Sequence, residues 1–218
     1  MPSMIVIPDN DFVPLDDRPG VAFKAKRIVH ARMRIHRNVH KQLKFSVKMV
    51  TVATGEDIPE SDAQAYARKV ADGLAPFIPL AGLARGPRPG PSPYDIAIER
   101  QSWVIVELDP WLDNWQFGKD YLGITTKVAK SGDNFGLQHV YPSKPDGTPG
   151  TIAHGNIKDE KCKVAYFGVA RRAKGESQYF NLHTDFLQPA RPGSRSMHRM
   201  IVIFDPDVGN NGGFPIPP

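Results

Sequence analysis

Between residues 18 and 55, apolar and cationic side chains alternate, and this alternation constrains the fold more than any other feature of the chain. Two runs show it, with apolar residues on odd positions: Val21, Phe23, Ala25, Val29, Ala31, Met33 and Ile35, then Leu43, Phe45, Val47 and Met49. Successive side chains of a β-strand point to opposite faces. The pattern therefore predicts two antiparallel strands, most simply a hairpin, with the odd residues buried. Arg27 and Ile28 interrupt the alternation and predict a β-bulge.

The even positions of the same two runs predict a cationic, outward-pointing face. Residues 18–55 hold ten Lys and Arg and no Asp or Glu, whereas the rest of the chain holds 18 basic and 23 acidic residues. Two interpretations stay open: the charges are screened by water, salt or an acidic neighbouring strand, or they bind an anionic partner such as an acidic protein surface. Nucleic acid is the less favoured partner, because the outward positions lack aromatic residues for base stacking. The predicted basic face comprises Lys24, Lys26, His30, Arg32, Arg34, His36, Lys44 and Lys48.

The remainder of the chain predicts one helix and several short strands. A capping-box pattern begins at Ser61 and an apolar stripe at four-residue spacing follows, so a peripheral helix is expected over about residues 62–74. The proline- and glycine-rich residues 82–93 predict an extended loop, and residues 209–218 predict an extended tail. Strand-like segments are residues 94–98, 103–108, 122–128, 135–141, 164–170, 179–187 and 200–204. We therefore expect an all-β fold, a two-layer antiparallel β-sandwich or jelly roll, as a single domain over residues 1–218.

One segment has the residue spacing of a metal site. His183 and Asp185 show the His-x-Asp spacing of a non-haem iron centre, with His198 as the candidate third ligand. The phenylalanines of the same segment take the opposite parity, so the alternation predicts that His183 and Asp185 point away from the core. The favoured interpretation is a surface pair with a local hydrogen bond.

A second segment resembles a calcium loop at its start. Asp205 and Asp207 supply the first carboxylates, but Gly209 occupies the fifth position and no glutamate occupies the twelfth. Turn chemistry of Asp, Asn and Gly explains the segment equally well.

Aromatic and acidic residues gather between residues 109 and 117. Trp111, Asp113 and Trp115 form a possible ligand cluster of the kind that binds carbohydrate, although core or interface aromatics are the commoner explanation. Cys162, the single cysteine, has no activating partner nearby in the sequence, and one cysteine cannot form an intramolecular disulfide.

Function is the least constrained property of the sequence. The sequence contains no Gly-x-Ser-x-Gly motif, phosphate-binding glycine loop or dinucleotide fingerprint. We therefore expect a non-enzymatic interaction or structural protein that self-associates as a homo-oligomer through charged and proline-rich surfaces. Two alternatives remain: a binding protein that takes an anionic ligand or nucleic acid on the basic face, and a metal-dependent jelly-roll enzyme.

The expected location is the cytoplasm, without a cofactor or a membrane partner. No apolar run approaches the roughly 18 residues of a membrane helix, and the first residues lack the pattern of a signal peptide. The single cysteine suits a reducing compartment.

Overall fold

The alternating segment folds as the predicted hairpin. Strands β2 (Ala25–Arg37) and β3 (Leu43–Ile58) pair antiparallel, and Met33 lies opposite Val47. The register shifts between Ala25 and Arg27 and again between Ile28 and Val29, which confirms the predicted bulge. The odd residues of β2 from Ala25 to Ile35 that carried the pattern are buried, as the alternation requires.

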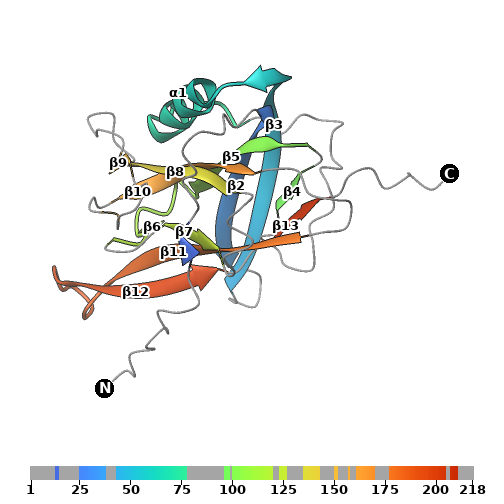
Figure 1. Cartoon of the computed structure of the whole chain (residues 1–218). Coiled ribbons are helices and arrows are strands. Elements are labelled where there is room, and N and C mark those ends of the chain that lie inside the picture. The colour runs from blue at the N-terminus through green and yellow to red at the C-terminus, as the bar shows by residue number, and fades with distance from the viewer. Residues whose placement is uncertain are drawn as a thin grey trace.

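The hairpin belongs to one of two sheets, which has six strands among the described residues. The computed structural model describes residues 13–14, 25–37, 43–77, 96–98, 100–119, 123–126, 135–142, 150–151, 157, 161–169, 177–204 and 207–210. Among these residues, one sheet has the strand order β3-β2-β5-β10-β8-β9 (Figure 1). Its further strands are β5 (Ser102–Leu108), β10 (Cys162–Val169), β8 (Phe135–Pro142) and β9 (Gly150–Thr151). The pairs are antiparallel except that β2 and β5 run parallel.

The second sheet is built around one long strand, β11 (Ser177–Pro189). β7 (Ile124–Thr126), β6 (Trp115–Phe117) and β12 (Met197–Phe204) pair with it antiparallel, as does β13 (Asp207–Asn210). β1 (Val13–Pro14) extends the sheet from β7, and β4 (Ile96–Ile98) joins β13 in parallel. The all-β prediction with one helix is confirmed, and both sheets are mixed because each contains one parallel pair.

The principal core lies between the two sheets. The first sheet contributes Met33, Val104 and Phe167, and the second contributes Trp115 and Phe180, all completely or almost completely buried. Every residue of β5 is buried, which is expected of a central strand whose two faces are both covered. Burial of the large aromatic side chains supplies much of the apolar area that stabilises the fold.

Helix α1 (Glu60–Ala71) covers the opposite face of the first sheet, as Figure 1 shows. Its buried residues Ala63, Ala67 and Val70 belong to a second core cluster that includes Trp103 and Tyr166. The predicted capping box is wrong, because the N-cap residue is a proline that makes no side-chain cap hydrogen bond. The helix also begins and ends earlier than the predicted residues 62–74.

Two predicted segments fall wholly or mostly outside the described residues. Residues 82–93 lie outside them, and of the predicted tail 209–218 the first two residues belong to β13 while the rest lie outside. The single domain over 1–218 stays a prediction. No helix among the described residues is long and apolar enough to cross a membrane.

Candidate functional site

The candidate site lies on the face of the first sheet that carries α1. Near the helix this face is apolar, with Ile28 of β2 and Trp103 and Ile105 of β5 in the second core cluster. Farther along both strands it becomes polar. Because β2 and β5 are parallel and in register, Arg32 lies directly beside Glu107.

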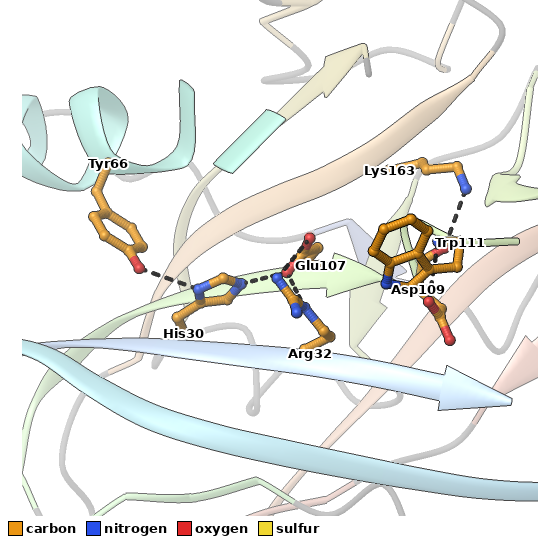
Figure 2. A network of polar contacts seen from close by, with 7 residues as sticks. All are labelled: His30, Arg32, Tyr66, Glu107, Asp109, Trp111 and Lys163. Atoms are coloured by element: carbon orange, nitrogen blue, oxygen red, sulfur yellow. Dashed lines mark hydrogen bonds and ion pairs between the residues drawn. The ribbon is translucent and has the colours of Figure 1, made fainter. Parts of the chain in front are cut away.

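A hydrogen-bonded network joins these two strands to the helix, as Figure 2 shows. The Arg32 guanidinium binds the Glu107 carboxylate at two points, Nε to Oε2 at 2.6 Å and Nη2 to Oε1 at 3.2 Å. His30 Nε2 lies 2.8 Å from Glu107 Oε2, and His30 Nδ1 lies 3.2 Å from the hydroxyl of Tyr66 on α1. His30 is fully buried and Glu107 is 4% exposed. The network therefore lies in a region of low dielectric constant, where charges interact more strongly than they do in water.

The surroundings fix the protonation states at the two ends of this network. Burial alone would raise the pKa of Glu107, but the hydrogen bonds and charges of His30 and Arg32 outweigh it, and the net pKa is lowered. Burial raises the pKa of Tyr66, and the negative charge of Glu107 adds to the rise against the smaller effect of Arg32. Near neutral pH, Glu107 is therefore a carboxylate and Tyr66 a protonated phenol.

Phe77, which follows α1 in the chain, covers the network. Its ring centroid lies 4.3 Å from the central guanidinium carbon of Arg32, a cation–π contact. The His30 ring meets the same phenyl ring edge to face at a centroid distance of 4.9 Å. This cover leaves the Arg32 side chain 14% exposed.

The structure places the residues of the predicted basic face in different environments. His36, Lys44 and Lys48 are exposed, while Lys26, Arg32 and Arg34 are partly buried. The outward orientation is wrong for His30, because β2 is an interior strand and this part of its even face lies beneath Tyr66 and Phe77. Lys26 is 3.9 Å from Asp57, and Lys24 lies outside the described residues.

The cations beyond the helix share one region of the sheet. Register places Lys48 opposite Arg32, Ser46 opposite Arg34 and Lys44 opposite His36. The Nε atom of Arg34 is buried and has no hydrogen-bond partner among the described residues. We refer to this group as the cationic end of the hairpin, made up of Arg32, Arg34, His36, Lys44 and Lys48.

A second polar group lies where β5 ends. The Lys163 ammonium donates to the backbone carbonyls of Asp109 at 3.1 Å and Leu112 at 2.6 Å, and the Asp109 carboxylate accepts the backbone N–H of Trp111 at 3.1 Å. Burial lowers the pKa of Lys163, and the nearby carboxylates of Asp113, Asp109 and Glu107 oppose this shift. Trp111 is 83% exposed.

The predicted ligand cluster of Trp111, Asp113 and Trp115 is not assembled. Asp113 is exposed like Trp111, but Trp115 lies in the core between the sheets, where its Nε1 donates to Thr184 Oγ1 at 3.0 Å. The reason is the turn between residues 111 and 114, after which the chain enters β6.

The surface position predicted for His183 and Asp185 is wrong, because both are buried. They lie on β11, an interior strand flanked by β6 and β7 on one edge and β12 on the other. His183 Nε2 lies 2.8 Å from Thr125 Oγ1, and Asp185 Oδ2 accepts the backbone N–H of Lys119 at 3.0 Å. Burial lowers the pKa of His183 to about 4.

No metal centre is formed within the described part of the chain. No group of three or more His, Cys, Asp or Glu residues there could hold a metal ion. Asp205 lies outside the described residues, as does the side chain of Asp207, whose backbone is in β13.

Sequence reasoning did not identify Glu107, Tyr66 or Lys163 as site residues. A signal for Glu107 was present, since it is the one charged residue within the apolar run from Trp103 to Leu108. A charge in a buried central strand needs a partner, and the neighbouring cationic strand was the natural source.

The chain was also compared with known proteins. Residues 36–213, most of the chain, match a family model described as a predicted novel nucleotide synthetase. The matched range begins at the last two residues of β2, so Glu107 and Trp111 lie inside it and His30 and Arg32 precede it. No curated protein and no solved structure matches the chain. A synthetase is an enzyme, so this match overturns the expectation of a non-enzymatic interaction or binding protein.

Proposed function

Because the chain belongs to the family of predicted novel nucleotide synthetases, we propose that it is an enzyme that forms a nucleotide product. We place the phosphate groups of its substrate on the cationic end of the hairpin. The observation that carries this placement is the gathering of five cationic or basic side chains on neighbouring positions of β2 and β3, beyond the cover of α1.

The charge and geometry of this region support phosphate binding. Arginine binds phosphate through two parallel N–H donors, and lysine adds a point charge. Glu107 engages Nε and Nη2 of Arg32, so the Nη1 side of the guanidinium lies outside that pair. Arg34 brings a second guanidinium, and exposed Lys48 lies opposite Arg32. One buried carboxylate among these cations leaves the region positively charged, which attracts an anionic substrate.

We assign proton transfer in the reaction to the hydrogen-bonded side chains of Tyr66, His30 and Glu107. In the neutral tautomer that fits these contacts, His30 donates from Nε2 to Glu107 and accepts the Tyr66 hydroxyl at Nδ1. A carboxylate that orients an imidazole, which in turn contacts a hydroxyl, is the arrangement of general acid–base sites. Tyr66 is partly exposed, whereas His30 and Glu107 are buried.

Nucleotide binding tests the phosphate site directly. We expect the doubly substituted Arg34→Gln/Lys48→Gln protein to bind ribonucleoside triphosphates at least about tenfold more weakly than the unmodified chain, measured by isothermal titration calorimetry at fixed salt. The affinity of the unmodified chain should also fall as salt rises. Lys69→Gln, which removes an exposed cation from α1, is the matched control and should bind normally. Equal affinities for all three proteins would refute the phosphate site.

Product formation tests the enzymatic assignment. The chain is incubated with the four ribonucleoside triphosphates and Mg²⁺, and new nucleotide species are sought by liquid chromatography and mass spectrometry. We expect His30→Gln to bind nucleotide with near-normal affinity but to lose about 100-fold or more in product rate, because a general acid–base group contributes that much. A His30→Gln protein that is stably folded and fully active would remove His30 from the mechanism.

Two further properties stay predictions. We expect the enzyme to work in the cytoplasm, where its buried cysteine stays reduced. Self-association as a homo-oligomer is tested by light scattering across a range of protein concentrations.

A further inference from the structure

Trp111 differs from the other two tryptophans of the chain in its exposure. Trp103 and Trp115 are 1% and 0% exposed, whereas Trp111 is 83% exposed. Tryptophan carries the largest aromatic surface of any side chain, and folding normally removes most of that surface from water. An indole left in solvent therefore offers a large apolar area to a ligand.

The turn that carries Trp111 is held in place by several hydrogen bonds. The Asp109 carboxylate accepts the Trp111 N–H, and the Asp109 carbonyl accepts the Leu112 N–H at 3.2 Å. The Lys163 ammonium then joins the carbonyls of Asp109 and Leu112 from the neighbouring strand. Lys163 is 6% exposed, and burying a lysine opposes folding unless its donors are satisfied. The buried cation thus fixes the backbone of the turn, so less backbone entropy is lost when a ligand binds there.

The position of the turn relates it to the cationic end. The last register pair of the parallel strands is Met33 with Leu108. Arg34 on β2 and the turn after β5 therefore both follow the same end of the paired segment. Figure 2 shows Trp111, Asp109 and Lys163 near the end of β5, past the Arg32–Glu107 pair.

We propose that Trp111 is the stacking platform for the base of the nucleotide whose phosphates occupy the cationic end of the hairpin. The proposal rests on the proposed function and adds the residue that holds the base. Aromatic stacking accepts any base, because every base has a π-face, so Trp111 supplies affinity for nucleotides over inorganic phosphates. Discrimination among bases belongs to other groups.

Tryptophan fluorescence reports on this platform directly. Because the other two tryptophans are buried, acrylamide should quench mainly Trp111 in the folded protein. We expect each of the four ribonucleoside triphosphates to lower the emission and to protect Trp111 from acrylamide. Inorganic triphosphate should bind the cationic end without either effect, since it has no base.

Substitution supplies the matching affinity measurement. Trp111→Ala should weaken the binding of ribonucleoside triphosphates about tenfold and leave the affinity for inorganic triphosphate unchanged. Lys163→Met, which releases the turn, should weaken nucleotide binding in the same selective way by a smaller factor. Leu74→Ala is the control, because Leu74 is another large apolar residue that is mostly exposed, at 73%.

The outcomes distinguish the platform from the phosphate site. Nucleotides that bind Trp111→Ala as tightly as the unmodified chain, or that bind without protecting Trp111, overturn the platform while the proposed function stands. Failure of both nucleotides and inorganic triphosphate to bind removes the proposed function, and the platform with it. Selective loss of nucleotide affinity together with protection of Trp111 supports both.

Discussion

His183 makes the stability of this protein depend on pH in a calculable way. Burial lowers the pKa of its imidazole from 6.5 to about 4 in the folded chain. Between these two values the unfolded chain binds a proton that the folded chain does not, so stability is lost as the pH falls from about 6.5 toward about 4. The full shift corresponds to about 3 kcal/mol at about 1.4 kcal/mol for each pH unit, and the step from pH ~7 to pH ~5 removes about 2 kcal/mol of it.

Urea unfolding at several pH values measures this contribution. The free energy of unfolding is determined for the unmodified chain and for His183→Gln, which keeps a polar group near Thr125 but cannot titrate. Other titrating groups affect both proteins equally. We therefore expect the free energy of unfolding of the unmodified chain to fall by about 2 kcal/mol more than that of His183→Gln between pH ~7 and pH ~5. His198→Gln, which makes the same substitution at an exposed histidine of β12, is the matched control. Parallel curves for His183→Gln and the unmodified chain would refute the reasoning.

Three further predictions concern other buried groups. Glu107→Gln should lower the free energy of unfolding by roughly 3 kcal/mol, because it leaves the Arg32 cation without its counter-charge, and adding Arg32→Met should restore part of the loss in denaturant titrations. Thr184→Val removes the acceptor of the Trp115 indole N–H and should cost about 1–3 kcal/mol in the same assay; an unchanged midpoint would contradict that bond. Cys162, 2% exposed, should react with a thiol reagent only as fast as the chain opens, and rapid labelling under native conditions would contradict its burial.

The sequence predicted the local geometry of the hairpin well, because alternation and its interruption are local signals. The odd residues of β2 are buried and the bulge near Arg27 and Ile28 is present. The alternation indicates that the two faces of a strand differ in polarity, but it does not predict which residues cover the polar face. Tyr66 and Phe77, which cover His30, come from another part of the chain, and only the fold brings them there.

Short elements and single residues marked the other limits of prediction. β6 has three residues, too few to establish a period, so the burial of Trp115 could not be separated from the exposure of Trp111 four residues earlier. The parity of His183 was assigned correctly relative to its neighbours, but β11 is covered on the face expected to meet solvent. Glu107 could have been found, since a lone carboxylate in an apolar strand signals a buried partner.

The parallel contact between β2 and β5 has a consequence for how the chain reaches its native state. The Arg32–Glu107 bond joins residues 75 positions apart, and such distant pairing slows folding because a long loop must close first. During synthesis the hairpin emerges well before β5, with the edge of β2 still unpaired. Unpaired strand edges attract other chains, and lysine and arginine oppose that association. We therefore expect the charges of Arg32 and Arg34 to oppose association of the hairpin with other chains until β5 pairs with it.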